Sequence, residues 1–81
     1  MSEIIYLKKV WNLGSESFQK IIKNVGILNV DETLGISTKK DVETDSILNI
    51  ALNQGYKKTT KEEFDKAYIE VVNEINELSK L

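Results

Sequence analysis

The chain of 81 residues contains no histidine, no cysteine and no arginine, and all eleven of its basic residues are lysine. Histidine is the side chain that titrates near neutral pH, the thiolate is a strong nucleophile, and guanidinium is the preferred bidentate partner of carboxylates and phosphates. A surface without these groups can bind other molecules but has few means of catalysing a reaction. We therefore expect a non-enzyme with no catalytic residues, no metal ligands and no cofactor.

Other absences in the sequence narrow the kinds of protein that this chain can be. Without cysteine, neither a disulfide nor a thiolate metal site contributes to stability, which must come from packing. The sequence has no apolar run of about 18 residues, and the apolar patch at residues 4–7 is too short for the core of a signal peptide. A composition of 41% hydrophobic and 30% charged residues is typical of a folded soluble protein. We expect one domain over residues 1–81, with no membrane span, in the cytoplasm.

The charge is unevenly distributed along the chain. Residues 1–40 carry six lysines and four acidic residues, whereas residues 41–81 carry five lysines and nine acidic residues. Neither half has the concentrated basic patch of a nucleic-acid-binding protein, and arginine, the most common specific contact to guanine, is missing. The charge pattern therefore argues against DNA or RNA as the partner.

The clearest predicted element is a C-terminal amphipathic helix over residues 61–80. Apolar residues recur there at spacings of three and four from Phe64 to Leu78. Thr60 and Glu63 form a capping box, in which the threonine hydroxyl accepts the Glu63 amide while the Glu63 carboxylate reaches back. A helix over residues 61–80 follows.

A shorter helix is predicted over residues 43–54. Its apolar residues share one face, Gly55 stands where a helix commonly ends, and Tyr56 can fold back as the hydrophobic partner of that cap.

Two more helices are predicted in the N-terminal half. Apolar residues at helical spacing from Ile4 to Trp11 predict a helix that ends at Gly14, although its β-branched start is also compatible with a strand. Ser15 is a suitable N-cap for the next helix, which we expect to end at Gly26. Residues 26–43 have irregular spacing and are interpreted as a loop, with a hairpin of residues 27–30 against 34–37 as the alternative.

The fold class predicted from these elements is all-α. We expect a small four-helix bundle with a long C-terminal helix and an irregular central connection.

The acidic residues do not indicate a catalytic or metal site. Glu62, Glu63 and Asp65 lie in the first turn of a helix, where the helix dipole and the cap already favour carboxylates. Asp41, Glu43 and Asp45 alternate as in a calcium loop, but the glycine and the later acidic ligand of such a loop are missing.

A weak helix-turn-helix pattern is present at Leu13-Gly14-Ser15. In that reading the helix over residues 15–26 presents polar and charged side chains to DNA, and the alternative is an ordinary antiparallel helix pair.

Several residues are candidates for binding a partner. Trp11, the only tryptophan, is either a core anchor or an exposed hot spot, and some apolar residues fall outside the main helical faces. The candidate partner-binding residues are Ile5, Lys8, Trp11, Leu13, Gln19, Lys20 and Lys23. The apolar positions from Phe64 to Leu78 either join this helix to its neighbours or form a homo-oligomer with a second copy.

Four segments resemble a known family in their order along the chain. They are Tyr6-Leu7-Lys8-Lys9-Val10, the segment from Ser15 to Ile22, the segment from Ile50 to Tyr56, and Thr60-Lys61-Glu62-Glu63-Phe64. Together they resemble the nif-eleven-type leader domain of ribosomally made, enzymatically modified peptides. The resemblance implies a helical domain to which a modifying enzyme docks. The chain departs from the family in its longer connection at residues 26–43 and in having no double glycine or modifiable tail before Leu81.

The sequence thus predicts a non-catalytic interaction module whose partner is another protein, with a leader-like recognition domain as one form of it. The alternatives are a small helix-turn-helix DNA-binding regulator and a self-associating structural protein.

Overall fold

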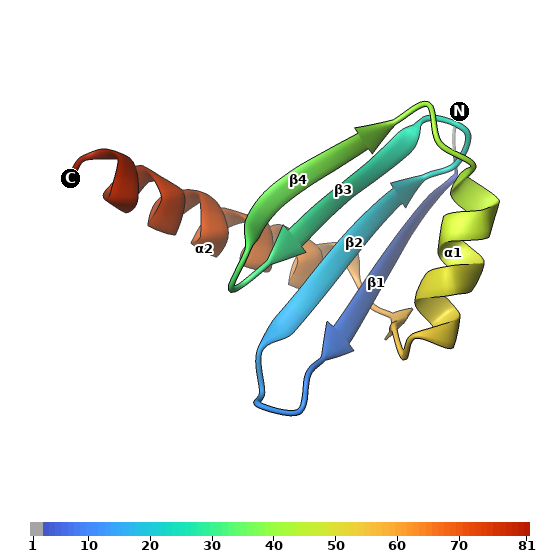
Figure 1. Ribbon diagram of the computed structural model, residues 1–81, viewed down its shortest axis with the longest axis horizontal. Coiled ribbons are helices and arrows are strands. Elements are labelled where there is room, and N and C mark those ends of the chain that lie inside the picture. The colour runs from blue at the N-terminus through green and yellow to red at the C-terminus, as the bar shows by residue number, and fades with distance from the viewer. Residues whose placement is uncertain (1–2) are drawn as a thin grey trace.

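The computed structural model describes residues 3–81 and shows an α+β fold, in which a five-stranded antiparallel sheet carries one helix on each face (Figure 1). In chain order the elements are β1 (Ile4–Val10), β2 (Glu16–Ile22), β3 (Gly26–Asp31), β4 (Gly35–Lys40), α1 (Thr44–Asn53), β5 (Lys57–Lys58) and α2 (Lys61–Ser79). The strand order is β4-β3-β2-β1-β5. The first four strands are consecutive hairpins, and β5 returns to the free side of β1.

The core consists of two clusters, one on each face of the sheet. Successive side chains of a strand point to opposite faces, so each central strand contributes to both clusters. Leu7 and Ile21 are buried on one face beneath α1, whereas Phe18 and Val30 are buried on the other face against Phe64 of α2. The sheet is therefore the middle layer of three.

Two glycines fix the geometry of the hairpin formed by β3 and β4. Gly35 has a φ of 91°, in the left-handed region that favours glycine, directly after a turn in which the Asp31 carboxylate accepts the amides of Thr33 and Leu34. At the other end of the hairpin, a Cβ on Gly26 would lie 2.5 Å from the carbonyl oxygen of Lys39. β3 and β4 can approach this closely only because residue 26 has no side chain.

Both C-terminal helices lie close to the predicted ranges of residues 43–54 and 61–80 and are confirmed. The hydroxyl of Thr60 accepts the amide of Glu63 at 3.1 Å, as the capping box predicts, but the Glu63 carboxylate accepts from the Thr59 hydroxyl. Gly55 follows α1 with a φ of 96°, and the Tyr56 amide donates to the carbonyl of Ala51 at 3.0 Å. The Tyr56 ring folds back onto the cluster beneath α1, as expected.

The all-α fold class predicted from the sequence is wrong, as is the four-helix bundle. The segment expected as the first helix forms β1, and residues 15–26 form β2 and the turn that follows it. The central connection at residues 26–43 is mostly the β3–β4 hairpin, in which Val30 pairs with Ile36. A hairpin, the alternative to a loop, is therefore observed, but residues 27–30 pair with 36–39 and not with 34–37. The helix-turn-helix interpretation is wrong because its second helix is a strand.

Within residues 3–81, neither helix has the length and apolar character needed to cross a bilayer.

Candidate functional site

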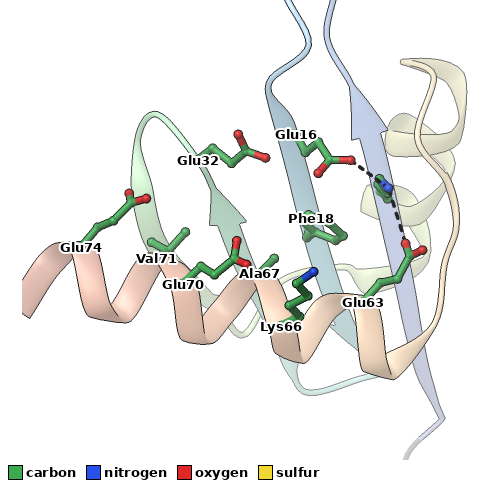
Figure 2. Close-up of a pocket in the computed structure, with 10 residues that line it drawn as sticks. Glu16, Phe18, Glu32, Glu63, Lys66, Ala67, Glu70, Val71 and Glu74 are labelled. Atoms are coloured by element: carbon green, nitrogen blue, oxygen red, sulfur yellow. Dashed lines mark hydrogen bonds and ion pairs between the residues drawn. The ribbon is translucent and has the colours of Figure 1, made fainter.

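A groove of about 320 Å³ lies between α2 and the strands beneath it, on the side of the helix that faces the start of β2 and the end of β3 (Figure 2). Its floor is apolar and consists of Phe18 from β2 together with Ala67 and Val71 from α2. These three side chains belong to the core cluster on this face of the sheet. The methyl group of Ala67 fills little space, which leaves room between the helix and the strands.

The rim of the groove carries mainly carboxylates. Two come from the strand side, Glu16 at the start of β2 and Glu32 just after β3, and the Glu32 amide donates to the carbonyl of Glu16 at 3.3 Å. Three more come from one flank of α2, where side chains three, four or seven positions apart lie in a row: Glu63, Glu70 and Glu74. Five glutamates against the two lysines, Lys8 and Lys66, leave an excess of three negative charges.

At one end of the groove, Lys8 is held between two carboxylates. Its Nζ lies 2.8 Å from Glu16 Oε2 and 3.5 Å from Glu63 Oε2, as the dashed lines in Figure 2 show. The hydrogen bond to Glu16 raises the pKa of Lys8, and both carboxylates add to the effect. The pKa of Glu63 is lowered, first by the hydrogen bond from Thr59 and then by the charge of Lys8. The charge of Lys8 is therefore balanced by Glu16 and Glu63 and is not free to attract a ligand.

The opposite end of the groove keeps its negative charge. Within residues 3–81, Glu32, Glu70 and Glu74 have no ion-pair partner. Figure 2 shows these three carboxylates around the open part of the groove, above the apolar floor. No group of three or more metal-ligating side chains in the described part of the chain is placed to hold a metal ion. The arrangement offers hydrogen-bond acceptors and apolar surface to a cationic, partly apolar ligand.

A second polar cluster lies on the opposite face of the sheet. The Trp11 Nε1–H donates to Ser17 Oγ at 2.7 Å, and Ser17 Oγ donates in turn to Asp31 Oδ2. Burial alone would raise the pKa of Asp31, but the hydrogen bonds from Ser17 and from two backbone amides outweigh it and lower that pKa. Burial raises the pKa of the nearby Tyr56. Trp11, Ser17 and Asp31 all have hydrogen-bond partners, so the cluster is interpreted as a structural link between two hairpins.

The candidate partner-binding residues predicted from the sequence do not form one surface. Ile5 is half-buried beneath α1, and Gln19 lies on the same face of the sheet, where its Oε1 is buried without a hydrogen-bond partner in residues 3–81. Lys8 and Lys20 are on the α2 face, because they directly follow Leu7 and Gln19, which are on the α1 face, and successive side chains of a strand alternate. Of these residues, the groove includes Lys8 alone.

The remaining candidates lie in turns. Leu13, in the turn between β1 and β2, is 99% exposed, and Lys23 lies in the turn between β2 and β3. Trp11 lies just after β1, is 44% exposed and belongs to neither core cluster, with Lys9 Nζ 3.9 Å from its ring centroid. Of its two interpretations, the core anchor is wrong.

The sequence analysis missed the groove glutamates. The spacing of Glu63, Glu70 and Glu74 places them on one flank of the predicted C-terminal helix, and this was a usable signal. Glu16 and Glu32 had no such signal, because only the pairing of β2 with β3 brings them together. No protein-family model, curated protein or solved structure matches this chain.

Proposed function

We propose that this protein is a non-catalytic interaction domain whose groove holds a basic, amphipathic segment of a partner protein. The observation that carries the proposal is the combination of an apolar floor with a rim that has three more negative charges than positive ones. A segment with apolar side chains on one side and lysine or arginine side chains on the other satisfies both parts of the groove at once.

The dimensions of the groove fit a short segment. The stretch of α2 from Glu63 to Glu74 is about 16 Å long at 1.5 Å per residue. That length accommodates about three turns of a helix or about five residues of extended chain. Exposed ion pairs contribute little affinity by themselves, and Phe18 and Val71 are each only 4% exposed, so we expect a weak complex in which the carboxylates select a basic partner.

The DNA-binding alternative loses its motivating feature, because residues 16–22 form a strand. The helical fold implied by the resemblance to leader domains is also wrong, while the resemblance itself stays a prediction. The proposal rests on the groove and not on that resemblance.

The proposal is tested by NMR titration with two peptides of about 12 residues, long enough to span the groove as a helix. One peptide carries leucine at helical spacing among lysines, and the other carries glutamate in place of every lysine. We expect the basic peptide to shift the amides of Phe18, Ala67 and Val71, with an affinity that falls as salt is added. The acidic peptide is expected to leave these signals unchanged.

A pair of matched variants ties binding to the groove. The variant Glu32→Gln with Glu70→Gln removes two rim charges, and the control Glu43→Gln with Glu62→Gln removes two exposed carboxylates elsewhere. We expect the groove variant to bind the basic peptide at least about tenfold more weakly, and the control to bind as the parent does. Equal binding by both variants, equal binding of both peptides, or no shifts at millimolar peptide would overturn the proposal.

A further inference from the structure

The C-terminal end of α2 projects past the sheet. Val71 is only 4% exposed and Val72 is half-buried, but every residue from 73 to 81 is exposed. Figure 1 shows these last turns, drawn in red, continuing beyond β4, where no strand lies beneath them. We call residues 73–81 the overhang.

The apolar side chains of the overhang lie on the side of α2 that, earlier in the helix, packs on the sheet. Ile75 and Leu78 are four and seven positions after Val71, so all three lie on the same side of the helix. Val71 packs on the sheet as part of the core, whereas Ile75 is 43% and Leu78 is 69% exposed. The row of apolar side chains that packs α2 on the sheet therefore continues past β4, where Ile75 and Leu78 have no strand to pack against within residues 3–81.

The strand next to the overhang has a free edge. β4 pairs with β3 on one side, and no strand among residues 3–81 pairs with its outer side. It ends in Lys39 and Lys40, which have no ion-pair partner within residues 3–81. Lysine on an edge strand normally opposes pairing with another chain. Here the overhang carries Glu74 and Glu77, whose charge is opposite to that of the edge, and Lys80, whose Nζ lies 3.8 Å from Glu77 Oε1.

We propose that two copies of this chain form a two-fold symmetric dimer in which their β4 strands pair antiparallel. Rotation about an axis perpendicular to the sheet keeps both α2 helices on the same face and places the partner's β4 beneath each overhang. Ile75 and Leu78 then cover the second copy of the sheet. Glu74 and Glu77 lie over the lysine end of the partner strand, where Lys40 shares the α2 face with Ile36, and this offsets the repulsion that protects a lone edge.

The dimensions of the two elements allow this arrangement. A six-residue strand is about 20 Å long, and a helix with its side chains is about 10 Å wide. One helix therefore covers about half the length of β4, and the partner's overhang fits beside it. Antiparallel pairing also places Lys39 and Lys40 at opposite ends of the two strands, away from their counterparts.

Sedimentation of the full chain over a range of concentrations tests the dimer. We expect the average mass to rise toward that of two chains. The variant Ile75→Ser with Leu78→Ser is expected to weaken association at least about tenfold. Ile69→Ser is the matched control, because Ile69 is 58% exposed on the other side of α2 and remains outside the overhang. All of these positions are exposed, so none of the variants disturbs the core of the monomer.

A charge exchange tests the geometry directly. One variant carries Lys40→Glu, because Lys40 is on the α2 face of β4, and a second carries Glu74→Lys and Glu77→Lys. Each alone places like charges at both contacts and is expected to be monomeric. Mixed together they restore both contacts, and we expect a heterodimer. The groove variant Glu32→Gln with Glu70→Gln should still dimerise, which separates this test from that of the groove.

Isotope-filtered NMR on a mixture of labelled and unlabelled parent chains completes the test. Contacts between Ile36 or Thr38 of one copy and Ile75 or Leu78 of the other are expected. The inference is overturned by a monomer at concentrations up to about 1 mM, by mixed charge variants that stay monomeric, or by a dimer without these contacts.

Discussion

At the scale of single residues, Ser17 and Asp31 join two hairpins. Ser17 is 4% exposed, and its hydroxyl accepts a hydrogen bond from Trp11 while it donates one to Asp31. The same Asp31 carboxylate closes the turn between β3 and β4 through Thr33 and Leu34. The Asp31 carboxylate thus stabilises the β3–β4 hairpin and, through Ser17 and Trp11, connects it to the end of β1.

The variant Asp31→Asn tests this role through its pH dependence. Hydrogen bonds to the charged carboxylate lower the pKa of Asp31 in the folded protein, so the stabilisation is complete above the unfolded pKa of about 3.9 and is lost as the pH falls through the folded pKa. We expect Asp31→Asn to reduce the free energy of unfolding by about 1–2 kcal/mol at pH 7 and by less at pH 3. Urea denaturation at both pH values measures this difference.

The control for that experiment is Glu43→Gln, an exposed carboxylate without a side-chain hydrogen bond at the start of α1. A deficit of Asp31→Asn that is the same at pH 3 and pH 7 would show that the charge of the carboxylate has no part in the stabilisation.

At the scale of elements, the helices were predictable because their ends carry local chemistry. Thr60 with Glu63 marks the start of α2, and Gly55 marks the end of α1, within a few residues of sequence in each case. Turn residues such as Asp31 and Gly35 lie between strands but do not identify the flanking segments as strands, whose stability depends on partners elsewhere in the chain.

The spacing of apolar residues explains why β2 was misread as a helix and β3 as part of a loop. Phe18 and Ile21 are three positions apart, which is typical of one helical face, and Ile27 and Val30 are also three apart but are not part of a longer helical pattern. In a strand the same spacing places the two side chains on opposite faces. Both faces of this sheet are covered, so both side chains of each pair are buried, in different clusters. A strand buried on both faces has no polar alternation to distinguish it from a helix.

The anchoring of α2 gives a prediction at this scale. Phe64 is 2% exposed and lies among Tyr6, Phe18 and Tyr68, with ring centroids 5.5 to 6.4 Å away. We expect Phe64→Ala to lower the free energy of unfolding by about 3–5 kcal/mol, because it removes buried area and leaves a cavity.

Ile69→Ala, on the exposed side of the same helix, is the comparison and should change the free energy of unfolding by less than about 0.5 kcal/mol. Chemical denaturation followed by circular dichroism measures both values. Similar effects of the two substitutions would mean that α2 does not pack on the sheet through Phe64.

At the scale of the whole molecule, the groove depends on contacts between distant parts of the chain. The glutamates that α2 contributes to the groove follow from the predicted helix. The glutamates from the strands, Glu16 and Glu32, come together only because β2 pairs with β3. Reading residues 15–26 as a helix removed that adjacency. The candidate site could be predicted from the sequence only as far as one flank of one helix.

Truncation tests how much of the chain the monomer needs. A chain that ends at Asn73 lacks nearly all of the overhang, none of which is buried. We expect it to unfold within about 1 kcal/mol of the full chain at low micromolar concentration, where a weak dimer has dissociated. A chain that ends at Thr60 loses Phe64 and Val71 and is expected not to fold. Thermal unfolding of both measures the difference, and a large loss in the first would place the overhang inside the monomer's core.

The two edges of the sheet differ, and this difference limits how many molecules can join edge to edge. At one border, β5 pairs with Leu7 and Lys8, and the Thr59 amide donates to the carbonyl of Tyr6, so the middle of β1 is already occupied. The other border, β4, has no paired strand along its length in the described part of the chain. A sheet with two open borders can add molecules indefinitely and polymerise into a fibre. With one border reduced to the two-residue strand β5, the proposed joining through β4 is a single event that does not continue into a fibre.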